Sequence, residues 1–151
     1  MRTRLRPLGA ALALAVLLPL GGCGGASIDD YCADLGAHQK EMAAMIDSAS
    51  SSALLGHLPM LHDLADKAPK DLTDEWQVFV GALDDLEKAL KDAGVKPSDF
   101  QDGKPPAGLS SAHRTAITEA ADQLASDDVA QAAGGIEQEG RDVCKVNFGV
   151  G

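Results

Sequence analysis

LTDEWQVFVGALDDLEKAL, residues 72–90, is the stretch that decides the fold. Its apolar residues recur at alternating steps of four and three, the spacing that gathers side chains along one face of an α-helix. They are Leu72, Trp76, Phe79, Leu83, Leu86 and Leu90. The charged residues between them fall outside this register. The stretch therefore predicts an amphipathic helix in the core of a helical bundle, ended by a glycine cap at Gly94.

Two helices are predicted on the N-terminal side of this stretch. The first spans 28–48 with Ser27 as its N-cap, and the second spans about 53–68. Pro59 lies inside the second helix, where an interior proline costs about 3 kcal/mol. The pattern predicts either a kink at this point or a helix that restarts with Pro59 in its first turn.

Two further helices are predicted on the C-terminal side, over 111–125 and 127–146, each preceded by a serine that can cap it. The second carries a stripe of small residues, which permits close helix packing. Segment 95–109 contains several prolines and glycines, which exclude regular structure there. No run alternates β-branched with polar residues, so no strand is predicted.

The N-terminal residues have the form of an export signal. Arg2, Arg4 and Arg6 precede an apolar run that extends from Leu8 to Leu20. A membrane-spanning helix needs roughly 20 apolar residues, whereas the core of a signal peptide needs only about 7–15. The shorter length and the basic flank therefore favour a signal peptide.

The apolar run ends in Leu20-Gly21-Gly22-Cys23, which resembles the lipobox of bacterial lipoproteins. In that family the cysteine receives a diacylglyceryl group and becomes the first residue of the mature protein. The resemblance implies a signal peptide at 1–22, a lipid on Cys23 and a short lipid-anchored tether at 23–27. Two acyl chains anchor a protein stably, whereas one binds reversibly. Ordinary secretion, with cleavage near Cys23, is the alternative.

The membrane is then the first expected partner, contacted through the lipid on Cys23. The domain is expected on the extracytoplasmic face of the cell membrane. The motifs DYC at 30–32 and DVCKV at 142–146, in a chain rich in alanine, glycine and aspartate, resemble small uncharacterised lipoproteins of high-GC Gram-positive bacteria. That resemblance implies no particular activity.

Lipidation of Cys23 would leave Cys32 and Cys144 as the remaining cysteines. An exported protein folds where disulfides are stable, so an even remainder predicts one bridge. This bridge would bring the start of the first helix to the end of the last one. Five strictly alternating helices place those ends on opposite sides, so we predict that segment 95–109 crosses back along the bundle.

The expected fold is all-α. It is an antiparallel bundle of four to five helices with a crossover loop, closed by one disulfide. The bundle domain is expected over 28–146 and a loose C-terminal tail over 147–151.

The charge of the chain excludes one class of partner. The formal net charge is −10, and removal of the three N-terminal arginines would make it more negative. Nucleic-acid binding requires a basic surface, so no nucleic acid is expected as a partner. Anionic lipid head groups would also be repelled, which leaves the lipid to hold the protein at the membrane.

The histidines are the only group that suggests a metal site. They lie on three of the predicted helices and are His38, His57, His62 and His113. His57 and His62 are five residues apart, about 140° around a helix, so both face one ion only if Pro59 bends the geometry. No zinc or calcium motif is present. We therefore predict no metal site and expect the histidines at the edges of the bundle.

The remaining chemical groups have structural explanations. Among the aspartate pairs at 29–30, 84–85 and 127–128, two precede helices, where negative charge stabilises the positive end of the helix dipole. Three methionines at helical spacing are expected as core filler, or alternatively as a surface for a soft metal or an apolar ligand. They are Met42, Met45 and Met60.

No catalytic motif of the hydrolase, phosphate-loop or dinucleotide type is present. We therefore predict that the protein is not an enzyme and that it binds no cofactor. The leading hypothesis is a lipid-anchored binding or interaction module with an envelope protein as partner. The alternatives are a carrier of an apolar small molecule, with a cavity lined by methionine and leucine, and a metal-binding envelope protein. An apolar cavity in the folded domain would favour the carrier.

Overall fold

The computed structural model describes residues 27–48, 50–100 and 104–148. These residues form α-helices joined by turns and two short 3₁₀ helices, with no strand among them. In chain order the elements are α1 (Ile28–Ala37), α2 (Gln39–Ser48), α3 (Ser51–Gly56), α4 (Leu58–Asp66), η1 (Lys70–Leu72), α5 (Thr73–Asp92), η2 (Pro97–Asp99), α6 (Ser111–Leu124) and α7 (Asp127–Asp142). The all-α prediction is confirmed. The signal peptide at 1–22, Cys23 and the tether as far as residue 26 lie outside the described residues.

All five predicted helical segments form, but two of them divide, which gives seven α-helices in the described part of the chain. The first divides at His38, whose backbone N–H donates to the carbonyl groups of Asp34 and Gly36 and so ends α1. The second divides at His57, and Pro59 lies in the first turn of α4. Proline is tolerated there because its missing N–H has no partner in a first turn, so the predicted restart is confirmed.

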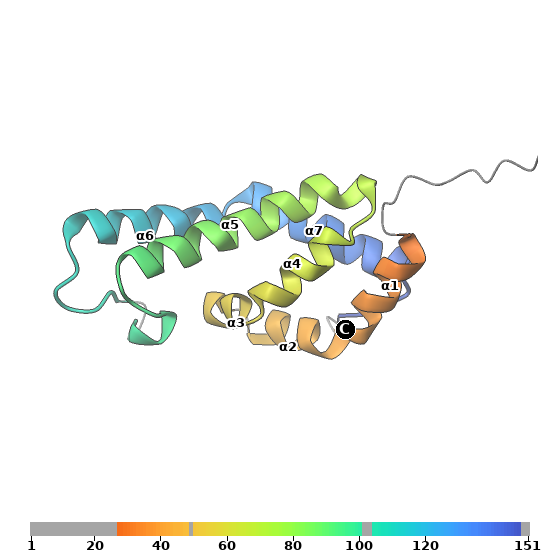
Figure 1. The fold of residues 1–151 in the computed structure, drawn as a ribbon, viewed down its shortest axis with the longest axis horizontal. Helices are drawn as coiled ribbons and strands as arrows, with labels where there is room; N and C mark the ends of the chain where they lie inside the picture. The colour runs from red at the N-terminus through yellow and green to blue at the C-terminus, as the bar shows by residue number, and fades with distance from the viewer. Residues whose placement is uncertain (1–26, 49, 101–103, 149–151) are drawn as a thin grey trace, which may run out of the picture.

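Helix α5 is the central element, and α6 and α7 lie along it one after the other (Figure 1). Near the end of α5, Leu86 and Leu90 pack with Ile117 of α6. Near its start, Trp76 packs in the same cluster as Ile136 of α7. The α6–α7 pair therefore runs antiparallel to α5 as one continuous return.

This arrangement corrects the predicted crossover. Helix α6 begins at the end of the molecule where α5 stops, and Phe100 and Leu109 both pack against the end of α5 (Figure 1). The described parts of segment 95–109 therefore lie at that end and do not return along the bundle. Cys32 and Cys144 can meet because Ser126 caps a new helix that continues in the direction of α6, so the last two predicted helices together make only one reversal (Figure 1).

The predicted disulfide is confirmed, with Cys32 and Cys144 bonded and their Cα atoms 4.9 Å apart. It joins α1 to the residues that follow α7. Within the described part of the chain, no helix combines the length and the apolar character that crossing a membrane would require.

The C-terminal tail corrects a second prediction. Helix α7 ends at Asp142, and Phe148, assigned from the sequence to a loose tail, is 2% exposed in the main core. Lys145 has a φ of 58°, which turns the chain back toward α7. The backbone N–H of Val146 donates to the Gly140 carbonyl at 2.8 Å. Residues 149–151 lie outside the described part.

Gly140 makes this packing possible, and its replacement is expected to be destabilising. An added Cβ at Gly140 would lie 2.8 Å from Phe148 Cε2 and 3.3 Å from Leu35 Cδ2, whereas at Gly134 nothing lies within 4 Å. We expect Gly140→Ala to lower the free energy of unfolding by about 1–3 kcal/mol. The matched control Gly134→Ala should raise it by about 0.5–1 kcal/mol, because alanine is the better helix former.

Urea denaturation of both variants measures the difference. Because the two expected changes have opposite signs within one helix, they separate a steric effect from helix propensity. A stabilising Gly140→Ala would show that Phe148 does not pack on α7.

Candidate functional site

An apolar pocket of about 130 Å³ lies between α2, α4, α5 and α7. Its walls are mainly large hydrophobic side chains from these helices, namely Met42, Met45, Leu61, Trp76, Phe79 and Ile136. Phe148 of the C-terminal segment closes one side. The pocket is therefore built by residues from both ends of the domain, which the disulfide holds together.

The methionines of α2 are one helical turn apart, so both side chains face the same side. Met42 and Met45 are buried, as core-filling residues are, and they also line the pocket, as ligand-contacting residues would. Met60 packs against the same core but does not line the pocket. Methionine side chains are unbranched and adapt their shape to a neighbour, so these walls can adjust to a ligand.

The pocket has one polar wall residue and one exposed apolar one. The carboxylate of Glu137 is paired with Arg141 one turn further along α7, so its charge is balanced outside the pocket. Ile46 is 39% exposed and lies where the pocket meets the surface. An engineered apolar cavity of about 150 Å³ binds benzene, so a space of this size can hold one small apolar group.

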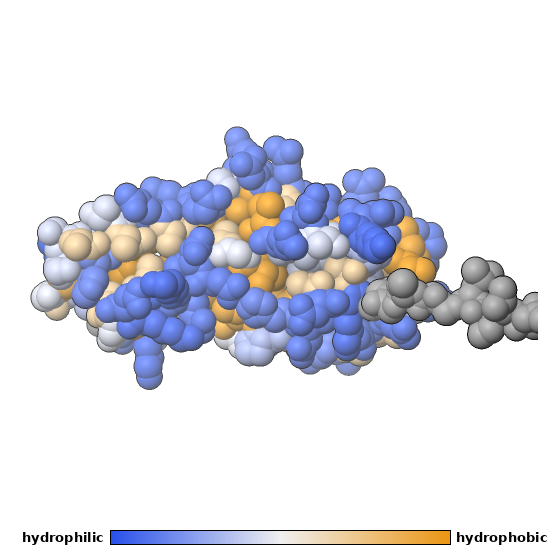
Figure 2. Space-filling model, turned by 45° about the horizontal axis from the view of Figure 1, so that its top comes forward, coloured by the Kyte–Doolittle hydropathy of each residue, from blue (hydrophilic) through white to orange (hydrophobic). Residues whose placement is uncertain are grey.

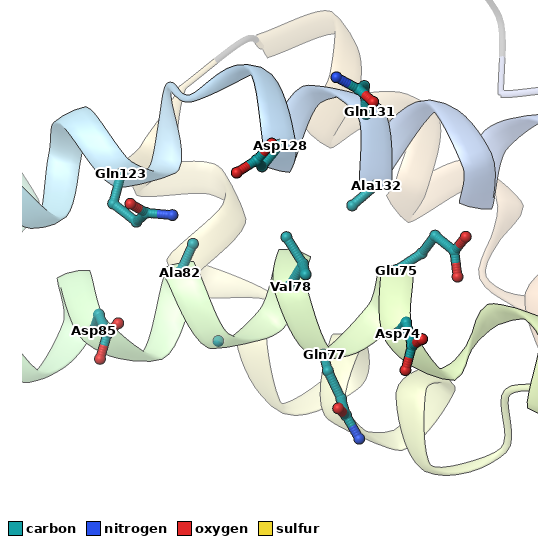
Figure 3. A pocket seen from close by; sticks show the side chains of 11 residues that line it. Asp74, Glu75, Gln77, Val78, Ala82, Asp85, Gln123, Asp128, Gln131 and Ala132 are labelled. Atoms are coloured by element: carbon teal, nitrogen blue, oxygen red, sulfur yellow. The ribbon is translucent and has the colours of Figure 1, made fainter.

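A second, open groove of about 770 Å³ runs between α5 and the α6–α7 pair (Figure 3). Val78 and Ala82 point from α5 toward the opposite helices, and Asp128 points back from α7. The carboxylates of Asp74 and Asp85 also line it but are 11 residues apart on α5, which corresponds to about 16 Å along the helix. This groove is polar, shallow and acidic.

The groove carries one close contact. A Cβ added at Gly135 of α7 would lie 3.2 Å from Glu75 Cγ, so the absence of a side chain at Gly135 leaves room for the Glu75 side chain between α5 and α7. Among the described residues, no three histidine, cysteine or acidic side chains come together as metal ligands would. The groove thus separates its carboxylates along the helices.

Within the described residues, the four histidines are not part of any group of three potential metal ligands. His62 Nε2 lies 2.9 Å from Asp84 Oδ1, which links α4 to α5. His38 lies 3.9 Å from Glu41 on the next turn, His57 stands between α3 and α4, and His113 lies in the first turn of α6. The structure does not bring His38, His57 and His113 to one point, so they give no support to a metal-binding function.

The aspartate pairs have the local roles expected of them. Asp29 and Asp30 lie in the first turn of α1, and the Asp30 backbone N–H donates to Ser27 Oγ at 3.1 Å. Asp127 and Asp128 occupy the first turn of α7. Negative charge at these positions stabilises the helix starts.

Tyr31, next to the disulfide on α1, has a pKa that folding raises strongly. It is fully buried and accepts a hydrogen bond from Trp76 Nε1 at 3.1 Å. Burial raises its pKa to about 12, because the phenolate would lose its hydration, and the hydrogen bond from Trp76 opposes the rise only in part.

This shift predicts how stability changes at alkaline pH. The unfolded chain releases the Tyr31 proton near pH 10 and the folded chain near pH 12, so the folded state holds more protons in that window. The stability contribution is complete below pH 10 and falls by roughly 2–3 kcal/mol as the pH rises to 12. Tyr31→Phe should flatten this part of the curve, which denaturation at stepped pH measures.

The difference between the wild-type protein and Tyr31→Phe isolates the tyrosine, because the two proteins share every other titratable group. The chain has a single tyrosine, so the absorbance of its phenolate reports the pKa directly. A midpoint at the ordinary value near 10 would contradict the burial of Tyr31.

Sequence reasoning predicts the methionines, Trp76 and Phe79 as core residues and offers the methionines alternatively as a ligand surface, but it does not place Trp76 and Phe79 in a pocket with them. It missed Phe148 entirely, because an isolated aromatic residue after the last helix has no periodic partner. Comparison of the chain with protein-family models, with curated proteins and with solved structures found no match. The function must therefore be inferred from these side chains and their arrangement.

Proposed function

We propose that this chain is a lipoprotein, anchored through Cys23 at the extracytoplasmic face of the cell membrane, whose helical domain is a non-enzymatic binding module for an apolar ligand. The observation that carries the proposal is the pocket walled by Met42, Met45 and Trp76. A pocket with apolar walls favours a carrier of an apolar small molecule over a module that only contacts another protein.

The size of the pocket limits the ligand. Sites that enclose whole drug-sized molecules have volumes of about 300–1,000 Å³, so about 130 Å³ suits a small apolar molecule or one apolar group of a larger one. Exposed Ile46 at the rim would contact the remainder of a larger ligand. A ring or a short branched chain is the group of matching size.

The expected tether supports a membrane source for this ligand. Residues 23–27 reach at most about 17 Å when fully extended. The domain would therefore remain close to the bilayer, where apolar molecules are concentrated. The acidic surface would keep the domain soluble beside the membrane while the lipid holds it there.

The test uses the processed protein in lipid nanodiscs, with methionine methyl groups labelled with ¹³C and benzene as the probe. We expect benzene to shift the Met42 and Met45 methyl signals saturably and to change the emission of Trp76, the single tryptophan. Ala133→Leu, which places a larger side chain at a pocket wall, should weaken binding by tenfold or more.

The control is Ala130→Leu, an exposed position one turn earlier on α7 that does not line the pocket; binding should be unchanged. Ile46→Phe, a change at the partly exposed rim, serves if Ala133→Leu reduces stability. Methyl signals that do not move at saturating benzene, or that move equally in Ala133→Leu, would show that the pocket is only core.

A second candidate function is interaction with an envelope protein at the groove of Figure 3. Val78 is 42% exposed within it, and apolar patches lie between hydrophilic residues on the face shown in Figure 2. Cross-linking from position 78 in intact membranes, with Lys88 as a control position on the same helix, would recover a defined protein partner only if this groove is the contact.

A further inference from the structure

A third recess lies at the opposite end of α5 from the disulfide, with a volume of about 570 Å³. Its floor is apolar and includes Leu86, Leu90, Phe100 and Ile117. Its rim carries the hydroxyl groups of Ser51 and Thr118 and the guanidinium of Arg114. These residues belong to the second apolar cluster, so this groove is separate from the methionine pocket.

The charge of this groove differs from that of the rest of the protein. The chain has 23 acidic and 13 basic residues, yet no carboxylate is among the described residues that line the groove. The groove of Figure 3, by contrast, is lined by Asp74, Glu75, Asp85 and Asp128. Arg114 is the ionisable residue of the lining and gives the recess a positive charge.

The guanidinium of Arg114 has more N–H donors than its hydrogen bond within the protein uses. One of its N–H groups donates to the Leu109 carbonyl at 2.8 Å, which holds the side chain in place. Within the described residues Arg114 forms no ion pair. A guanidinium has five N–H donors, and it binds a carboxylate through two parallel hydrogen bonds. The remaining donors are therefore available to an acidic ligand.

We infer that this groove binds a medium-chain carboxylate, with its carboxylate on Arg114 and its hydrocarbon chain over Leu86, Leu90 and Ile117. The apolar floor accounts for the chain and the guanidinium for the acid. The volume is within the range of sites that hold small molecules. Within the described lining, the carboxylate of the ligand would meet Arg114 and no aspartate or glutamate.

The experiment again uses the processed protein in nanodiscs, with isoleucine and methionine methyl groups labelled with ¹³C and sodium decanoate as the probe. We expect decanoate to shift the Ile117 signal and to leave the signals of Met42 and Met45 in place. Decanol, which has the same chain without the charge, should bind at least tenfold more weakly. The two sites are thus read separately, so failure of one proposal leaves the other testable.

Two variants test the contacts. Arg114→Gln should weaken decanoate binding roughly tenfold and remove the preference over decanol, whereas Lys104→Gln, a change at an exposed lysine outside the lining, should do neither. Thr118→Trp should block the groove from an exposed position, and Thr115→Trp, at an exposed position of α6 that does not line the groove, should not.

Three results would overturn the inference. Decanol binding as tightly as decanoate would show a merely apolar surface. Decanoate shifting the methionine signals while Ile117 stays unchanged would place the ligand in the other pocket. Unchanged affinity in both Arg114→Gln and Thr118→Trp would place it outside the groove.

Discussion

Cys23→Ser, introduced behind an ordinary secretory signal peptide, is expected to change the protein from almost wholly membrane-bound to almost wholly soluble outside the cell. Each buried methylene group of a lipid contributes about 0.8 kcal/mol, and two acyl chains anchor stably. Without them the net charge, which is −10 for the whole chain and more negative once the three N-terminal arginines are removed, opposes binding to anionic head groups. Fractionation of cells and medium, followed by immunodetection, measures the change.

The control is Gly25→Ser behind the native signal, which makes a similar polar change in the tether and keeps the cysteine; it should stay in the membrane fraction. Mass spectrometry of the native protein adds a direct check. The expected N-terminal peptide starts at Cys23 and carries diacylglycerol. An intact segment 1–22 or an unmodified thiol at Cys23 would contradict the lipoprotein assignment.

The second large effect is expected from removal of the disulfide. Cys32 and Cys144 are separated by 112 positions, and for a loop of about 100 residues the chain-entropy model gives about 4.7 kcal/mol of stabilisation. We expect the double variant Cys32→Ala/Cys144→Ala to lose about 3–5 kcal/mol of unfolding free energy. This is a large fraction of the total for a domain of this size. Urea denaturation with Trp76 emission as the signal measures it.

The loss should also affect the pocket. Val146 and Phe148 lie two and four residues after Cys144, in a segment that is also held by packing in the main core and by hydrogen bonds such as the one from Gln39 Nε2 to the Asn147 carbonyl. Releasing Cys144 should therefore loosen the Phe148 wall and weaken benzene binding. The wild-type protein in reductant should behave like the double variant.

Val143→Ala is the matched control, because this neighbouring side chain is 47% exposed and its loss should change stability by no more than about 0.5 kcal/mol. An unfolding midpoint that is the same with and without the bridge would show that the disulfide contributes no stability, and the expected role of the bridge in closing the pocket would then be wrong.

The helices and their ends could be predicted because they depend on residues close together in sequence. The spacing of the apolar residues over 72–90 identified α5, and Gly94 ends it with a φ of 68°, its N–H donating to the Lys91 carbonyl at 3.0 Å. Ser126 caps α7 through the Val129 N–H. Each such contact spans a few residues, so the local pattern contains the information.

The sequence by itself also determined the disulfide partners, because the lipobox resemblance removed one cysteine of three and left a single pair. It determined the net negative charge of the chain and the helical positions of Met42, Met45 and Met60. It did not determine that α6 and α7 form one return along α5, because capping at Ser126 specifies where a helix starts and leaves its direction open.

Only the tertiary structure decided where the recesses are and which side chains line them. The pocket joins α2 to Phe148, more than 100 positions away, and the groove places Arg114 of α6 beside Leu86 of α5. Such contacts depend on shape complementarity between distant surfaces, and no periodicity within one helix encodes it. The tail packs for the same reason: Phe148 is buried because Gly140 and Leu35 leave it a space that exists only after the helices have come together.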